Sequence, residues 1–321
     1  VRACYSMSAV ISPCKPFDPA RETDYRHWRE AKLADYPTDP GRLVVEVTDP
    51  GAPNPQEAAE IMACCRKTNM AIYRTTGERP SDKVAVSSLG RHFGLKRLDM
   101  NLRADEDSIT SLRVVPAGES THYIPYTDHA INWHTDGYYN LPEEQVRGFI
   151  LHCVQPADSG GTNFLMDPEI VYLLLRDENP DWVAALIQPD AMTIPANVED
   201  GREIRTAQAG PVFSVEKATG SLHMRYTTRT RSIVWKDDAN LRMAVGFIRE
   251  LLESDSPWIY RYRLQAGEGV ICNNVLHGRE AFADGPDTAR LLYRARYHDR
   301  MKGTAVSYTH LRAHETLGSI S

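Results

Sequence analysis

The sequence predicts a mainly β protein with inserted helices, built as a β-sandwich or jelly roll. Short segments of apolar or alternating residues, bounded by turn residues, recur along the chain and are typical of strands. Between them lie segments whose apolar residues recur at helical spacing. Short strands dominate around the polar motifs described below, and this favours a jelly roll decorated by helices.

The composition is that of an ordinary soluble globular protein, with 321 residues of which 42% are hydrophobic and 25% charged. The net charge of −6 and the lack of a basic tract predict no nucleic-acid and no membrane partner. Apolar runs such as residues 171–175 are too short to span a bilayer. Six cysteines without a CxxC pair favour free thiols over disulfides or structural zinc. We therefore expect a cytoplasmic protein without a secretory signal.

Residues 1–40 are rich in charge and proline and are interpreted as an N-terminal extension, followed by one domain over residues 41–304. Residues 305–321 are interpreted as a non-native tail, because residues 306–316 resemble the translation of a sequencing adapter; the alternative is a natural disordered tail. The histidines of this tail, His310 and His314, are left out of the site for that reason. The first residue is Val1, so we expect a truncated N-terminus or an alternative start codon.

Helices are predicted from caps and apolar spacing. Asn54 followed by Pro55 indicates an N-cap and a first helical residue, and Asp167 before Pro168 repeats the pattern. Apolar residues along 238–253 mark one face of an amphipathic helix. The predicted helices cover residues 25–34, 54–66, 168–179, 181–187 and 238–253.

Strands are predicted where apolar residues run together or alternate. Residues 149–154 form a short apolar run typical of a buried strand, and residues 290–297 alternate so that Arg290, Arg294 and Arg296 share one face. Residues 85–128 are polar and irregular, and we expect a substrate lid there. The predicted strands cover residues 43–47, 70–74, 160–165 (turn plus strand), 258–264 and 270–276, besides those two.

A metal site is predicted by His134, Asp136 and His277. A strand holds residues i and i+2 on one face, so His134 and Asp136 point the same way. A second histidine, His277, follows at the end of the predicted strand 270–276. Two histidines and one carboxylate cover one face of an octahedral Fe(II) and leave three positions open for a co-substrate and O2. The pattern indicates an oxidative enzyme, with no catalytic residue expected beyond the metal ligands.

Five motifs in this order resemble the TauD/TfdA-like dioxygenases, which include taurine dioxygenase and gamma-butyrobetaine hydroxylase. They are His134-x-Asp136, Gly160-Gly161, Gly267-Glu268, Asn274-x-x-His277 and Arg290-x-x-x-Arg294, and the resemblance covers residues 120–300. It implies a double-stranded β-helix, the jelly-roll fold, with Fe(II) as metal and 2-oxoglutarate as co-substrate.

The resemblance also implies roles for individual side chains. Arg290 matches the arginine that pairs with the far carboxylate of 2-oxoglutarate, because a guanidinium binds a carboxylate through two hydrogen bonds. Either Thr162 or Asn163 contacts the same carboxylate. Arg294 matches a substrate-anion arginine, with a plain salt bridge as the alternative. The aromatic candidates for the substrate pocket are Trp133, Tyr138 and Tyr139, although aromatic residues that flank a buried motif more often belong to the core.

These residues predict an oxygenase that hydroxylates a small polar, anionic metabolite while 2-oxoglutarate is converted to succinate and CO2. Its partners are that substrate, 2-oxoglutarate and O2, and homo-oligomers are compatible with the resemblance. A sulfonate, a carboxylate and a sulfate ester remain open as substrates, as does a cation held by aromatic residues. The alternatives are a non-catalytic jelly-roll sensor of metal or 2-oxoglutarate, and a metal oxygenase that does not use 2-oxoglutarate.

Overall fold

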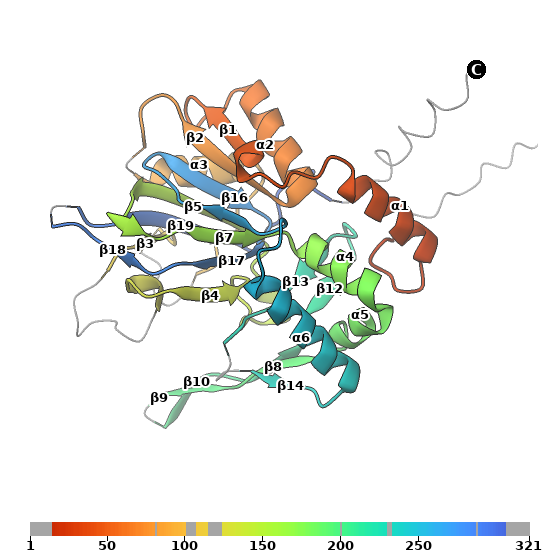
Figure 1. The fold of residues 1–321 in the computed structure, drawn as a ribbon. Helices are drawn as coiled ribbons and strands as arrows, with labels where there is room; N and C mark the ends of the chain where they lie inside the picture. The colour runs from red at the N-terminus through yellow and green to blue at the C-terminus, as the bar shows by residue number, and fades with distance from the viewer. Residues whose placement is uncertain are drawn as a thin grey trace, which may run out of the picture.

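The computed structural model describes residues 15–80, 82–100, 107–114, 124–199, 201–229, 233–286 and 288–305. Two sheets organise the molecule (Figure 1). The larger one has six strands in the order β1 (Val44–Val47), β2 (Met70–Thr75), β16 (Glu268–Cys272), β5 (Gly148–Gln155), β19 (Leu291–Tyr297) and β3 (Thr110–Leu112). The smaller one has four strands in the order β15 (Tyr260–Tyr262), β7 (Asn163–Met166), β17 (Leu276–Arg279) and β4 (Ile131–His134).

The two sheets are antiparallel throughout, except that β1 and β2 run parallel. Apolar side chains of both sheets meet in one core, which includes Phe149 and Val270 from the larger sheet and Leu165 and Leu276 from the smaller. This is the two-layer arrangement that a jelly roll requires. The predicted fold class is therefore confirmed.

Helices cover the outer face of the larger sheet. A second core forms there between β2, β16 and the helices α2 (Pro55–Thr68) and α3 (Lys83–His92), with Ile61, Leu89 and Ile271 among its buried residues. The predicted cap starts α2: the side chain of Asn54 accepts from the backbone amides of Gln56 and Glu57, and Asn54 and Glu57 complete a capping box.

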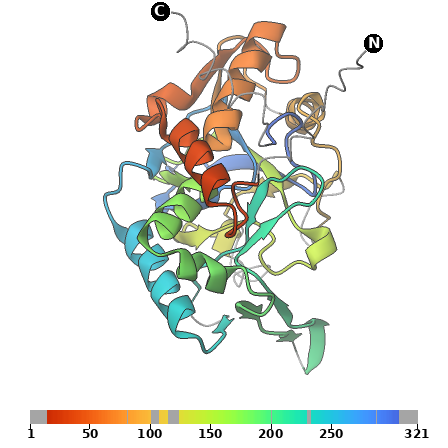
Figure 2. The ribbon, with the colours of Figure 1, turned by 90° about the vertical axis from the view of Figure 1, so that its right-hand side faces the viewer.

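The other helices gather at one end of the sandwich. There α4 (Pro168–Glu178) and α5 (Pro180–Leu186) pack beside α6 (Ala239–Glu253), as Figure 2 shows in green and cyan. The N-terminal helix α1 (Glu22–Leu33) packs against α4, where the hydroxyl of Tyr25 donates to Asp177 over 2.7 Å. A buried ammonium, Lys32, lies 2.7 Å from Asp167 and 2.6 Å from Glu169 and ties the two helices together. No helix of the described part of the chain combines the length and apolar character needed to cross a membrane.

Smaller elements complete the molecule. A segment between α5 and α6 folds into short strands that extend beyond the sandwich, and its hairpin β9–β10 projects from the lower edge in Figure 1. The remaining strands are β6 (Ser159–Gly160), β8 (Met192–Ile194), β9 (Asn197–Glu199), β10 (Arg202–Arg205), β11 (Gln208–Gly210), β12 (Phe213–Val215), β13 (Leu222–Met224), β14 (Val234–Trp235) and β18 (Phe282–Ala283). The 3-10 turns are η1 (Pro40–Leu43), η2 (Ile124–Tyr126) and η3 (Pro142–Glu144).

Two local predictions were wrong. Residues 85–128 are not irregular throughout, because they contain most of α3 and all of β3. Serines and Gly90 weaken the helical pattern there, yet Gly90 is needed because a Cβ at that position would collide with the hydroxyl of Tyr297. The predicted strand 270–276 is two strands, β16 and β17, separated by a turn in which Asn274 has a φ of 52°.

Other predictions lie outside what the structure describes. Part of the expected lid, residues 101–106 and 115–123, lies outside the described residues, and so does the tail from residue 306 on. The division into an extension over residues 1–40 and one domain over residues 41–304 stays a prediction.

Candidate metal centre

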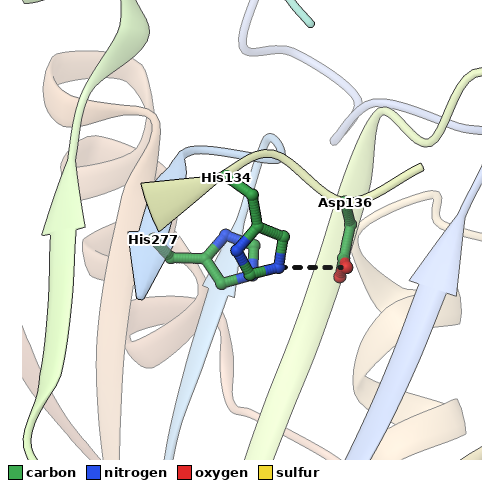
Figure 3. Close-up of side chains that lie close together, drawn as sticks. All are labelled: His134, Asp136 and His277. Carbon is green, nitrogen blue, oxygen red and sulfur yellow. Dashed lines mark ion pairs between the residues drawn. The ribbon is translucent and has the colours of Figure 1, made fainter. Parts of the chain in front are cut away.

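The two histidines of the predicted metal site lie on neighbouring strands of the smaller sheet. β17 pairs antiparallel with β4, and His277 stands directly opposite His134 in the register. The ring centroids of the two imidazoles are 4.2 Å apart (Figure 3). Strand pairing therefore brings together two residues that are far apart in the chain.

Asp136 follows β4 by two residues and turns back toward the histidines (Figure 3). The Oδ1 atom of Asp136 is 3.8 Å from Nε2 of His134, and one possible ligand atom from each of the three residues lies within 4.8 Å of the others. The side chain of Asn274 holds this turn, because it accepts from the amide of Asp136 over 2.8 Å and donates to its carbonyl over 3.0 Å. The turn between β16 and β17 thus positions the backbone of Asp136, whose side chain is the predicted ligand.

Both imidazoles are prepared for metal binding. Nδ1 of His134 lies 2.9 Å from the carbonyl of Asn132, and Nδ1 of His277 lies 2.9 Å from that of Val275. A carbonyl only accepts, so each Nδ1 carries the hydrogen and each Nε2 keeps its lone pair. Burial, together with the neighbouring imidazole of His277, lowers the pKa of His134 to about 3, and burial lowers the pKa of His277 as well. Both rings are neutral near pH 7, as a metal ligand must be.

The carboxylate of Asp136 is buried but ionised. Burial alone would raise the pKa of Asp136, but the guanidinium groups of Arg294 and Arg296 outweigh it and lower the pKa. Nη1 of Arg294 is 3.5 Å and Nη1 of Arg296 is 3.7 Å from Oδ1 of Asp136. Oδ2 has no hydrogen-bond partner within the described residues. A buried carboxylate oxygen without a partner is costly, and a divalent cation would satisfy it. The residues therefore fit a mononuclear metal.

Arg290 lies in a separate polar pocket. Only 4% of its surface is exposed, and it makes no ion pair with a carboxylate of the described residues. Burial lowers the pKa of Arg290 to about 10, so the group is a desolvated cation. The pocket around Arg290 is lined by Gly160, Gly161 and Asn163, among other residues.

The paired glycines are favoured by the backbone conformation in this pocket, and Gly160 by close packing as well. Gly160 and Gly161 have φ values of 68° and 73°, which L side chains rarely adopt. A Cβ on Gly160 would collide with the carbonyl oxygen of Ala281, and a Cβ on Gly161 would lie 3.8 Å from Nε of Arg290. The motif that the sequence singled out thus lets the chain pass close to Arg290.

Some of the other predicted site residues lie at the Arg290 pocket or the metal centre, and others do not. Asn163 faces the Arg290 pocket, whereas Thr162 is not among the residues that line it. Tyr138 packs edge-on against the ring of His134 at 6.4 Å, and the hydroxyl of Tyr139 accepts from Arg296 over 3.1 Å. Trp133 is not brought to the site: its Nε1 donates to the carbonyl of Leu252 and its ring packs against Phe164.

Several arginines near the site were missed or misjudged from the sequence. Arg296 was placed on the correct strand face but given no role, although it contacts both Tyr139 and Asp136. Arg225 is buried and donates to the carbonyls of Tyr138, Met192 and Gln208. Arg229 donates to the hydroxyl of Tyr138 over 3.3 Å. The only sequence signal for Arg229 was its place in the arginine-rich segment after Met224.

The fold and this triad define a metal-dependent oxygenase of the jelly-roll class. The chain belongs to the taurine catabolism dioxygenase TauD, TfdA family, whose model matches residues 33–296. The metal of this class is Fe(II) and the co-substrate is 2-oxoglutarate, as the sequence resemblance implied.

Two curated relatives carry the name uridine-5'-phosphate dioxygenase. The one from an Amycolatopsis species is 32% identical over 171 residues, which are 51% of this chain and 60% of that protein. The one from a Streptomyces species is 32% identical over 224 residues, which are 65% of this chain and 77% of that protein. The match thus spans less than two thirds of the first relative and more than two thirds of the second.

Solved structures share the fold at lower identity. An asparagine oxygenase in complex with Fe(II), 2S,3S-3-hydroxyasparagine and succinate has a TM-score of 0.55 and 16% identity, covering 87% of this chain and 91% of that one. A putative alpha-ketoglutarate-dependent taurine dioxygenase from Burkholderia xenovorans has a TM-score of 0.54 and 19% identity, covering 83% and 88%. These likenesses concern the fold.

Proposed function

We propose that this protein is an Fe(II)- and 2-oxoglutarate-dependent oxygenase that hydroxylates a small anionic metabolite and forms succinate and CO2. The observation that carries the proposal is the set of His134, Asp136 and His277, whose candidate ligand atoms lie within 4.8 Å of one another. Fe(II) bound there, together with 2-oxoglutarate and O2, would allow oxidation of an unactivated carbon of the substrate.

Arg290 binds the far carboxylate of 2-oxoglutarate in this proposal, and Asn163 contacts the same group. The support is the burial of the Arg290 guanidinium without a carboxylate partner among the described residues, in a pocket that Asn163 also lines. An unpaired buried cation is unfavourable, and a carboxylate that accepts two hydrogen bonds from it removes that cost. Thr162 is the weaker candidate because it does not line this pocket.

The substrate is an anion in this proposal, and a nucleoside 5'-monophosphate is the first candidate. The support comes from the name of the two relatives, uridine-5'-phosphate dioxygenase, and from Arg294 beside the carboxylate of Asp136. An additional guanidinium near a metal site suits a substrate with an anionic group. A cation held by aromatic side chains is disfavoured by the same arginine.

A non-catalytic sensor and an oxygenase independent of 2-oxoglutarate are the competing functions. A sensor needs no complete set of three ligands, and an enzyme that ignores 2-oxoglutarate has no need of Arg290. Formation of succinate separates both from the proposed function. We also propose a cytoplasmic location, which the reduced state of Cys64, Cys65, Cys153 and Cys272 supports. Self-association stays a prediction.

An anaerobic Fe(II) titration with and without 2-oxoglutarate tests the proposed function. We expect a weak visible charge-transfer band only when both are present, and its loss in His134→Ala. The matched control is His129→Ala, because His129 is an exposed histidine five residues away whose side chain lies outside the triad. Folded wild-type protein that binds iron but gives no band would contradict the 2-oxoglutarate assignment.

A further inference from the structure

Two adjacent tyrosines beside the metal centre are surrounded by arginines. Arg229 donates to the hydroxyl of Tyr138 over 3.3 Å, and Arg296 donates to the hydroxyl of Tyr139 over 3.1 Å. A third guanidinium, that of Arg205, lies 5.4 Å from the ring centroid of Tyr139. Arg205 and Arg229 both come from the segment between α5 and α6, and this segment therefore adds positive charge to the site.

The topology explains how Arg229 reaches the metal centre. Thr227 forms an isolated β-bridge with His134, and the amide of Thr228 donates to the carbonyl of Trp133 over 3.0 Å. On the other side, the amide of Thr135 donates to the carbonyl of Tyr226 over 2.9 Å. The chain before Arg229 thus runs along the strand that carries the first metal-ligand candidate.

Each of the two tyrosine hydroxyls keeps a hydrogen that it can donate to a ligand. A guanidinium carries only donors, so both hydroxyls act as acceptors in these contacts. Neither hydroxyl donates to a protein acceptor within the described residues, and each O–H hydrogen is therefore free for a ligand. Nε of Arg294 is also buried without a partner among these residues. Three donors are thus available near Asp136, from Tyr138, Tyr139 and Arg294.

The charges near these donors are not balanced by acids. Arg296 pairs with Asp99, and the one acidic partner of Arg294 among the described residues is Asp136, which the metal also requires. Arg229 and Arg205 form no ion pair with a carboxylate of the described residues. An incoming ligand that carries more than one negative charge would compensate this excess.

We propose that Tyr138, Tyr139, Arg294 and Arg229 form the binding site for a phosphoryl group of the substrate, and that Arg229 selects phosphate over a carboxylate. This inference rests on the proposed function and names the substrate class of the same site: a phosphomonoester. Such a group carries about −1.5 to −2 charges near pH 7 and three acceptor oxygens. A carboxylate has two coplanar oxygens, which one guanidinium satisfies.

The two hydroxyls belong to neighbouring rings and are held by different arginines. The rings of Tyr138 and Tyr139 are 5.1 Å apart and inclined by 82°, and Arg229 and Arg296 each donate to one of the hydroxyls. Nη1 of Arg296 is 3.1 Å from the Tyr139 hydroxyl and 3.7 Å from Oδ1 of Asp136, and this places the hydroxyl beside the metal-binding carboxylate. A phosphoryl group bound there brings the adjacent carbon of the ester toward the metal.

Binding to the Zn(II)-loaded protein tests the proposal without turnover. The probes are uridine 5'-phosphate, ribose 5-phosphate and inorganic phosphate, with uridine and taurine as ligands that lack a phosphoryl group, all measured by calorimetry. We expect Arg229→Gln to weaken uridine 5'-phosphate about 10- to 100-fold, the effect of losing one charge-assisted hydrogen bond, and to leave uridine unaffected. Tyr138→Phe, which keeps the ring, should weaken the same probe by a smaller factor.

The control variant carries the same substitution at an exposed arginine away from the site. Arg242 lies on α6 and forms an exposed ion pair with Asp237. Arg242→Gln removes the same charge there and should not change the affinity for uridine 5'-phosphate. Failure of all three phosphates to bind the wild type at millimolar concentration, or equal affinity in wild type and Arg229→Gln, would overturn the proposal. The Fe(II)–2-oxoglutarate band reports on the proposed function separately, so a normal band with no phosphate selectivity rejects the phosphoryl site alone.

Discussion

His134 and His277 stand opposite each other on paired strands, with ring centroids 4.2 Å apart and both Nδ1 atoms hydrogen-bonded to backbone carbonyls. The strand pairing and these hydrogen bonds fix the rings before any metal arrives. Such a site loses little conformational entropy on binding, so the metal should stabilise the folded chain.

Metal removal should therefore lower thermal stability. At a free metal concentration of 100 times Kd, a bound ion adds about 2.7 kcal/mol to the free energy of unfolding. We expect Mn(II) to raise the Tm of the chelator-treated wild type, and to leave that of His277→Ala unchanged. His129→Ala is the control, since His129 is exposed and outside the triad. Differential scanning calorimetry measures Tm. If Mn(II) raises the Tm of His277→Ala as much as that of the wild type, the metal binds elsewhere.

Replacing Arg290 should raise the requirement for 2-oxoglutarate. Arg290→Met removes the buried cation and two charge-assisted hydrogen bonds, each worth about 1.5–3 kcal/mol. We expect the KM for 2-oxoglutarate to rise at least about 10-fold, with kcat at saturation much less affected. Steady-state succinate formation measures both constants.

Arg263→Met is the matched control for that experiment. Arg263 lines the same pocket but is exposed, and its guanidinium already donates to the carbonyls of Ala157 and Asp158. A larger rise in KM for Arg263→Met than for Arg290→Met would reverse the assignment of the 2-oxoglutarate arginine.

Arg296 and Asp99 form a buried ion pair that supports the metal centre. Both side chains are less than a tenth exposed, and Arg296 extends the pair to Tyr139 and Asp136. Removing one partner of a buried pair leaves an uncompensated charge, so Arg296→Met should cost about 3–5 kcal/mol of unfolding free energy. Because the charge left behind is that of Asp99, adding Asp99→Asn should recover part of the loss in urea denaturation.

An exposed pair supplies the comparison. Arg97 pairs with Asp299 over 2.8 Å, but its side chain is 67% exposed. Arg97→Met should cost at most about 1 kcal/mol because solvent screens such pairs. Equal losses for Arg97→Met and Arg296→Met would show that burial does not strengthen the Asp99–Arg296 pair.

Local spacing and alternation in the sequence predicted the jelly roll, and the resemblance to the TauD/TfdA-like dioxygenases implied that His134, Asp136 and His277 act together. Contacts of segments outside those motifs were not predicted. Nothing near Arg229 indicates that Thr227 pairs with His134, or that Tyr138 is the partner of Arg229. Trp133 shows the converse: adjacent to a ligand in sequence, it points away because successive residues of a strand face opposite sides.

The buried cluster of Lys32, Asp167 and Glu169 should make stability depend on pH. Burial alone would raise the pKa of Glu169, but Lys32 and Arg300 outweigh it and lower the pKa below 4.5. A carboxyl with a lowered folded-state pKa stabilises the protein above its unfolded value, and this contribution is lost as pH falls through the folded value. Metal-free wild type should therefore lose unfolding free energy between pH 7 and pH 3, most of it below about pH 4.5. Lys32→Met should be about 3–5 kcal/mol less stable at pH 7 and lose less on acidification, because the carboxylate of Glu169 has then lost the partner that keeps it ionised. Urea denaturation at both pH values measures this, with Lys236→Met, which breaks the exposed pair with Asp190, as control. Parallel losses in wild type and Lys32→Met would show that the acid sensitivity arises outside this cluster.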